Sequence, residues 1–237
     1  MKDIETLTKE LFYCDPTTNI FERCRIIKKE YPLNVLGVYG QKLDACNIKI
    51  RYAARALLYI KQIVNELEHG EFIYFDDENR LKMYFYAESY LIFIRSTLDL
   101  VVSAYFIYQT GKTNIDSFND FLKKIDKDDS LILPESKEFW SYILEDYKTD
   151  EYYTWIHTIV GREKGLSLRD MIVHKSMVDI DTYIDERDKG RFYIILSNKD
   201  YGHVNPWLEG IFNHCSSIID TIINDIVSCE QNIKKNG

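Results

Sequence analysis

Residues 41–68 read QKLDACNIKIRYAARALLYIKQIVNELE, and this stretch decides the fold. Its apolar residues recur at alternating steps of three and four, which places them along one side of a helix. They are Leu43, Cys46, Ile50, Ala53, Leu57, Ile60, Val64 and Leu67. An apolar seam of this kind packs against a partner helix, so the stretch predicts a long helix in the core of a helical bundle.

Two further long helices are predicted, at 80–109 and 206–233. The last begins near Pro206, a residue favoured in the first turn of a helix. Its apolar stripe has the same spacing and consists of Ile211, Cys215, Ile218, Ile222, Ile226 and Cys229. The chain has only 4 prolines and 10 glycines, a scarcity that favours long helices over a many-turned β-sandwich.

The helix predicted at 80–109 is long and apolar enough to raise the question of a membrane span. Between 83 and 109 only Glu88, Arg95 and Asp99 carry charge. Three ionisable groups in the middle of the segment make insertion costly, so we expect a central, packed helix and no membrane. Steps of seven and four place the three charges on one helical face. We expect them to be largely buried, with Arg95 paired to a carboxylate, either as a structural ion-pair ladder or as the wall of an active site.

The remaining segments predict smaller elements around these helices. Short helices are expected within 1–32 and at 115–125, 134–147, 149–160 and 165–175, and a β-hairpin is expected between 178–185 and 191–197. The chain is therefore expected to be mainly α and to form a single domain over 1–237. Within it, 1–40 is an N-terminal helical extension and 41–233 is the core of long antiparallel helices.

Composition limits the function classes. The net charge of −8 argues against a general nucleic-acid coat protein, which would carry a basic surplus, but it allows a small basic pocket. The first residues mix charges without an apolar run, and the five cysteines never form Cys-x-x-Cys. These features favour a cytoplasmic protein with reduced, mostly buried thiols.

Most chemical motifs fail on spacing. Gly111-Lys-Thr113 lacks the earlier glycine of a phosphate-binding loop, because Phe106 stands there and a helix precedes it. The histidines and cysteines have no zinc spacing, so no metal and no cofactor are expected.

One motif remains as a candidate site, Arg169-Asp-Met-Ile-Val-His174. Asp170 lies four residues before His174, on the same helical face, where a carboxylate can orient the imidazole and raise its basicity.

The long paired helices, this motif at the head of a late helix and the final packing helix resemble the HEPN superfamily (higher eukaryotes and prokaryotes nucleotide-binding). Its motif is Arg, four to six residues, then His, with Asn, Asp or His commonly following the Arg. The resemblance implies a metal-independent ribonuclease of a defence or toxin system, acting as a homodimer. It implies that Arg169 and His174 are catalytic and that Asp170 supports them. Glu88, Arg95 and Asp99 would support this site from the neighbouring helix if their helical face turns toward the motif.

Two features depart from the family pattern. Some toxin members continue His-x-Tyr, whereas this chain has His174-Lys-Ser176, and the hairpin within 178–197 is an insertion. In a regular helix, positions five apart also point about 140° away from each other. Arg169 and His174 would therefore converge at an irregular helix start or across a dimer interface.

The alternative function is a non-catalytic helical module that binds a protein partner, such as an antitoxin, or a nucleotide.

Overall fold

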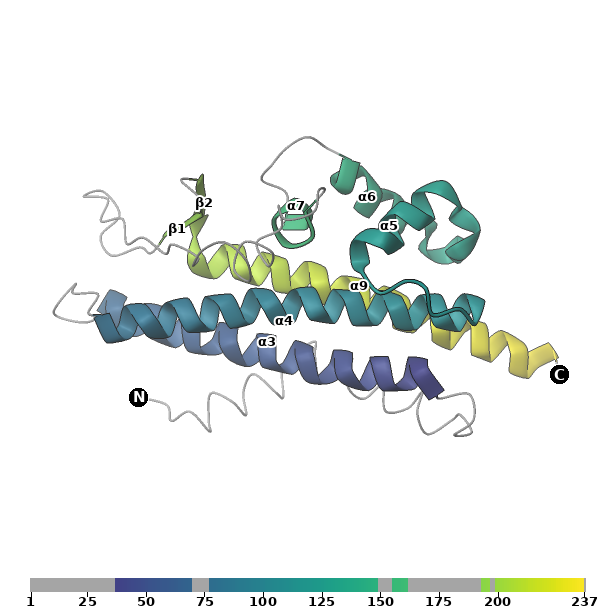
Figure 1. The fold of residues 1–237 in the computed structure, drawn as a ribbon, viewed down its shortest axis with the longest axis horizontal. Coiled ribbons are helices and arrows are strands. Elements are labelled where there is room, and N and C mark those ends of the chain that lie inside the picture. The colour runs from purple at the N-terminus through teal and green to yellow at the C-terminus, as the bar shows by residue number, and fades with distance from the viewer. Residues whose placement is uncertain (1–36, 70–76, 149–154, 162–192, 197–198, 237) are drawn as a thin grey trace. The chain divides into compact units, whose positions relative to one another are not determined.

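The computed structural model describes residues 37–69, 77–148, 155–161, 193–196 and 199–236 (Figure 1). The described chain is mainly α, as predicted. Its elements are α3 (Gly37–His69), α4 (Asp77–Thr110), α5 (Phe118–Lys127), the short 3-10 turns η1 (Asp129–Leu131) and η2 (Pro134–Ser136), α6 (Lys137–Lys148), α7 (Trp155–Ile159), β1 (Tyr193–Leu196), β2 (Lys199–His203) and α9 (Val204–Asn236).

The three long helices are confirmed, and each observed end lies one to four residues beyond the predicted one. Pro206 lies in the first turn of α9, where the missing N–H of proline costs nothing. The start predicted for α5, residue 115, was three residues early. Ser117 caps this helix, because its hydroxyl oxygen accepts a hydrogen bond from the Asp120 N–H, so the helix begins at Phe118.

Other predictions lie wholly or partly outside the described residues. These are the helices within 1–32, the helix at 165–175 and the first arm of the hairpin at 178–185. That hairpin therefore stays a prediction. The described strands β1 and β2 pair with each other, antiparallel, with Leu196 opposite Lys199. The sequence did not predict β2.

The chain divides into two compact units. Unit 1 comprises residues 1–51, 96–151 and 214–237, and unit 2 comprises 52–95 and 152–213. The helices α3, α4 and α9 each contribute a segment to both units, so the units are not consecutive halves of the chain. The single-domain organisation stays a prediction.

In unit 2, α3 and α4 are joined through aromatic rings. Tyr52 lies against Phe93, with ring centroids 5.2 Å apart, and Tyr59 stacks on Tyr86 at 4.7 Å. The residue number rises from 52 to 59 along α3 while that of the contacting ring falls from 93 to 86 along α4. These two segments therefore run antiparallel, as predicted for neighbouring helices of the bundle. Below the rings the predicted seam is buried, including Ala53, Leu57, Ile60 and Val64.

Contacts with α9 complete the described core of unit 2. The Tyr90 hydroxyl, fully buried, donates to the Leu208 carbonyl at 2.6 Å. On the surface, the Lys61 ammonium lies 2.6 Å from the Glu209 carboxylate. Both contacts join residues far apart in the sequence, and the first satisfies a buried polar group.

In unit 1 the core is a chain of enclosed rings. Tyr105 of α4 meets Phe121 of α5 edge-on, and Phe121 meets Trp140 of α6 edge-on with centroids 5.2 Å apart. All three side chains are completely buried. These rings hold the short helices α5 and α6 against α4.

One helix in the described part of the chain, α4, is long and apolar enough to cross a membrane by length and composition alone. The core helix of a protein outside the membrane passes the same test. In this structure 61% of the most apolar window of α4 is buried within the protein.

Candidate functional site

The residues predicted to be catalytic, Arg169, Asp170 and His174, lie outside the described residues. Their convergence and their roles stay predictions. The structure does describe the three charges of α4 that were expected to support them. Glu88 and Arg95 belong to unit 2, and Asp99 belongs to unit 1.

All three side chains are half-buried, so most of their surface is covered but they are not enclosed in the core. They lie on the flank of α4, away from the fully buried stripe that includes Ile94 and Leu98. A half-buried position keeps each charge in partial contact with water, which lowers its desolvation penalty.

Arg95 reaches the end of α7. Its Nη1 donates a hydrogen bond to the carbonyl oxygen of Val160 at 3.1 Å. The last carbonyls of a helix have no partner within it, and Gly161 follows in the left-handed conformation (φ 69°) usual after a helix end. Arg95 thus holds the point where the chain leaves α7. Its pairing with a carboxylate stays a prediction.

Asp99 acts at the opposite kind of helix end. Its Oδ1 accepts a hydrogen bond from the Phe118 N–H, at the first residue of α5, at 2.7 Å. The first N–H groups of a helix also lack partners, and negative charge is favourable beside them. This geometry supports the structural interpretation of Asp99, whose described contact fixes α5.

Unit 1 also contains a buried polar cluster that the sequence analysis missed. Asp225 of α9 is only 4% exposed. Its Oδ2 accepts hydrogen bonds from the hydroxyls of Tyr105 and Ser136, each at 2.7 Å. One carboxylate oxygen therefore joins α4, η2 and α9.

The environment of this cluster shifts both titratable groups. Burial raises the pKa of the Asp225 carboxyl above its usual range, although the hydroxyls of Ser136 and Tyr105 act to lower it, and nearby Glu135 adds to the increase. Burial also raises the pKa of Tyr105, and its hydrogen bond to Asp225 adds to that shift. Tyr105 is therefore a hydrogen-bond donor at every physiological pH, and its role here is to satisfy the carboxylate.

His214 is the histidine whose side chain the structure describes. It is half-buried on α9, and burial lowers its pKa, while Asp146 of α6 acts to raise it. The imidazole is therefore mostly neutral at pH 7.

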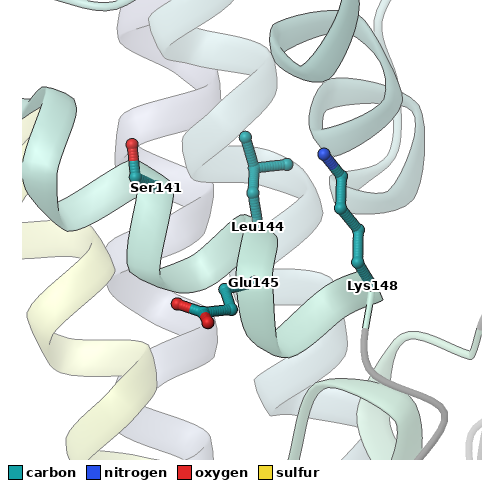
Figure 2. A pocket seen from close by; sticks show the side chains of 4 residues that line it. All are labelled: Ser141, Leu144, Glu145 and Lys148. Atoms are coloured by element: carbon teal, nitrogen blue, oxygen red, sulfur yellow. The ribbon is translucent and has the colours of Figure 1, made fainter.

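A shallow hollow of about 480 Å³ lies on α6, lined by Ser141, Leu144, Glu145 and Lys148 (Figure 2). All four side chains come from one helix. The Lys148 ammonium points away from the Glu145 carboxylate and pairs with Asp126. The hollow therefore lacks the converging polar groups of a ligand pocket.

Within the described ranges, no group of three or more His, Cys, Asp or Glu side chains is placed to hold a metal ion. Of the described cysteines, Cys46, Cys215 and Cys229 form no disulfide; the first two are buried and the third is half-buried. Comparison with protein-family models, with curated proteins and with solved structures found no match. The function must therefore be proposed from the chain itself.

Proposed function

We propose that this protein is a metal-independent endoribonuclease resembling those of the HEPN superfamily, of a defence or toxin type. The motif Arg169-Asp-Met-Ile-Val-His174 carries the proposal. A mainly α chain with three helices of more than thirty residues each is compatible with it. The finer architecture, a bundle of long antiparallel helices with a hairpin within 178–197, belongs to the same proposal.

The proposed chemistry uses the RNA's own nucleophile. Arg169 binds the scissile phosphate and stabilises the charge that develops on it. Neutral His174 removes the proton from the 2′-hydroxyl, and Asp170 orients the imidazole. The oxygen attacks the adjacent phosphorus, the bond to the 5′-oxygen breaks, and a 2′,3′-cyclic phosphate remains. DNA lacks the 2′-hydroxyl and is not cut.

The active form proposed is a cytoplasmic homodimer. Arg169 and His174 diverge on a regular helix, so two copies of the motif across an interface would complete the site. A protein partner such as an antitoxin would regulate it. Light scattering at micromolar concentration should find a dimer, and a strict monomer with no partner chain would count against this arrangement.

Purified protein is expected to cut single-stranded RNA in excess EDTA and to leave DNA intact. Activity should fall below roughly pH 6, as an imidazole with an ordinary pKa takes up a proton. Arg169→Lys should lose most activity, because an ammonium cannot reproduce the two-pronged grip of a guanidinium on phosphate. Cleavage that needs added Mg²⁺, or Arg169→Lys protein as active as wild type, would refute the mechanism.

A non-catalytic binding module is the second candidate, and the net charge of −8 favours it. In that case Arg169, Asp170 and His174 form a structural network. His174→Ala would then lower the melting temperature because a buried polar group loses its partner. Wild-type protein inert toward a broad RNA pool, together with this loss of stability, would replace the nuclease proposal.

A further inference from the structure

A row of aromatic rings lies along the α3–α4 contact of unit 2. Tyr52 meets Phe93, Tyr59 stacks on Tyr86 with an interplanar angle of 21°, and Phe85 meets Tyr86 edge-on with centroids 5.4 Å apart. We call these five rings the aromatic row. They come from two neighbouring helices (Figure 1).

The aromatic row is open to solvent. Tyr52 is 50% exposed and Phe85 is 64% exposed, while Tyr59, Tyr86 and Phe93 are half-buried. Next to it, Leu81 is 66% exposed, one helical turn before Phe85. A group of large apolar side chains left exposed along one seam, rather than scattered singly, indicates a binding surface.

A cation accompanies the rings. Arg55 is exposed on α3, three residues after Tyr52 and four before Tyr59, so all three side chains share one side of the helix. Among the described residues no carboxylate forms a salt bridge with Arg55. Two other cations of unit 2, Lys61 and Lys82, do form ion pairs, with Glu209 and Glu78.

The sequence of α3 reinforces this local charge. From residue 49 to residue 61 it carries four cations and no anion. They are Lys49, Arg51, Arg55 and Lys61, and Lys61 is already paired with Glu209. This contrasts with the whole chain, whose net charge is −8. A local basic segment interleaved with aromatic side chains is the pattern that binds nucleic acid, because it offers charge for phosphates and flat faces for bases.

We propose that the aromatic row and Arg55 bind single-stranded RNA. Unpaired bases stack on the exposed rings, Tyr52 and Phe85 first, and the Arg55 guanidinium pairs with a backbone phosphate. The choice of RNA rests on the proposed function, and the surface would hold the strand whose cleavage is proposed at Arg169 and His174. A duplex does not fit as well, because its bases are stacked on one another and their faces are closed.

A second copy of the chain fits the surface less well than RNA does. In a symmetric dimer contact the same patch meets itself, so the Arg55 charges of both copies would lie in one interface. Like charges at close range oppose such a contact. A polyanion such as RNA avoids this repulsion, because its negative charge is opposite to that of the basic segment of α3.

Fluorescence anisotropy of the full-length protein tests the proposal. The probe is a fluorescein-labelled oligouridine with 2′-O-methyl groups, which cannot be cleaved by 2′-hydroxyl attack. Arg55→Glu and the double variant Tyr52→Ala/Phe85→Ala should each weaken binding by about tenfold, since the loss of two stacked bases, or the reversal of a charge beside a phosphate, has an effect of that order. Rising salt should weaken wild-type binding and should weaken Arg55→Glu binding less steeply.

Matched control variants come from unit 1. Lys123→Glu makes the same charge change at an exposed lysine of α5, and Tyr142→Ala removes a ring that is 54% exposed on α6. Both should bind the probe as wild type does, and all variants should keep wild-type helicity by circular dichroism.

Three results would overturn the inference: wild type that does not bind at low salt, Arg55→Glu that binds as tightly as Lys123→Glu, or a duplex bound as tightly as the single strand. Because the probe is not cleavable, the outcome is independent of the nuclease mechanism. Binding that depends on Arg55 in a protein unable to cut RNA would support the surface and refute only the nuclease.

Discussion

Two groups of aromatic rings, one in each unit, have opposite environments. In unit 1 the rings of Tyr105, Phe121 and Trp140 are completely buried and hold α5 and α6 on α4. In unit 2, Tyr52 and Phe85 keep half or more of their surface in water. Aromatic content alone therefore does not separate core from binding surface. Exposure and the neighbouring charge do, since Tyr105 in unit 1 donates to the buried Asp225 carboxylate whereas the unit 2 rings flank the exposed Arg55.

The largest difference should appear when one ring is removed from each unit. Trp140→Ala takes away a fully buried ring that contacts Phe121 and Phe139, and should cost about 3–5 kcal/mol of unfolding free energy. Phe85→Ala should cost less than about 1 kcal/mol, because most of that ring is already hydrated. Urea unfolding measures both. Equal losses would show that the two sets of rings do not differ in role.

A second, smaller effect concerns the carboxylate in the unit 1 core. Asp225→Ala leaves the hydroxyls of Tyr105 and Ser136 buried without their acceptor, which should cost about 2 kcal/mol. Asp225→Asn keeps an acceptor oxygen and removes the charge, so it should cost less. An Asn variant that is destabilised as much as the Ala variant would show that charge, rather than hydrogen bonding, holds the cluster together.

Asp225 should also make stability depend on pH. Its pKa in the folded protein is raised above the ordinary value of 3.8, so the folded state holds the proton more tightly than the unfolded state does. The contribution of Asp225 to stability therefore falls as pH rises from about 3.8 through the folded pKa. The unfolding free energy of wild type minus that of Asp225→Asn should decrease over this interval. A difference that is constant with pH would contradict the raised pKa.

The smallest expected effect has the opposite sign and involves His214. Burial lowers its folded pKa below 6.5, so the folded state disfavours the protonated imidazole. Its contribution to stability is present above pH 6.5 and is lost as pH falls through the folded pKa. The half-exposed position and Asp146 limit the size of the effect. His214→Gln should slightly reduce the pH dependence of the unfolding free energy below pH 6.5. The same pH dependence in wild type and His214→Gln would contradict the lowered pKa of His214.

The long helices could be predicted because their evidence is local. Apolar residues at steps of three and four need only the sequence of one helix, and the start of α5 could have been read from Ser117 followed three residues later by Asp120. The buried carboxyl also left a local signal. Asp225 lies three residues after Ile222 and one before Ile226, within the apolar stripe of α9.

The partners of these residues could not be predicted, because the contacts are distant in the sequence. Tyr105 lies 120 residues before Asp225, and Arg95 lies 65 residues before Val160. The aromatic row was missed for a related reason. The sequence of α4 shows which residues are apolar but not which of them are buried. Phe85 and Leu81 are apolar like the core residues of α4, yet both are exposed. Only the packing of α3 against α4 distinguishes the buried apolar residues of α4 from the exposed ones.

The central claim is that this chain cuts RNA with Arg169 and His174, and analysis of the cleavage products tests it most directly. Wild type, His174→Ala and Arg55→Glu would each be incubated with unmodified single-stranded RNA in EDTA, and the product ends identified by mass spectrometry. We predict 2′,3′-cyclic phosphate ends from wild type, none from His174→Ala, and the same ends formed at lower RNA affinity by Arg55→Glu. Products from His174→Ala equal to those of wild type, or ends carrying a 3′-hydroxyl, would contradict the account.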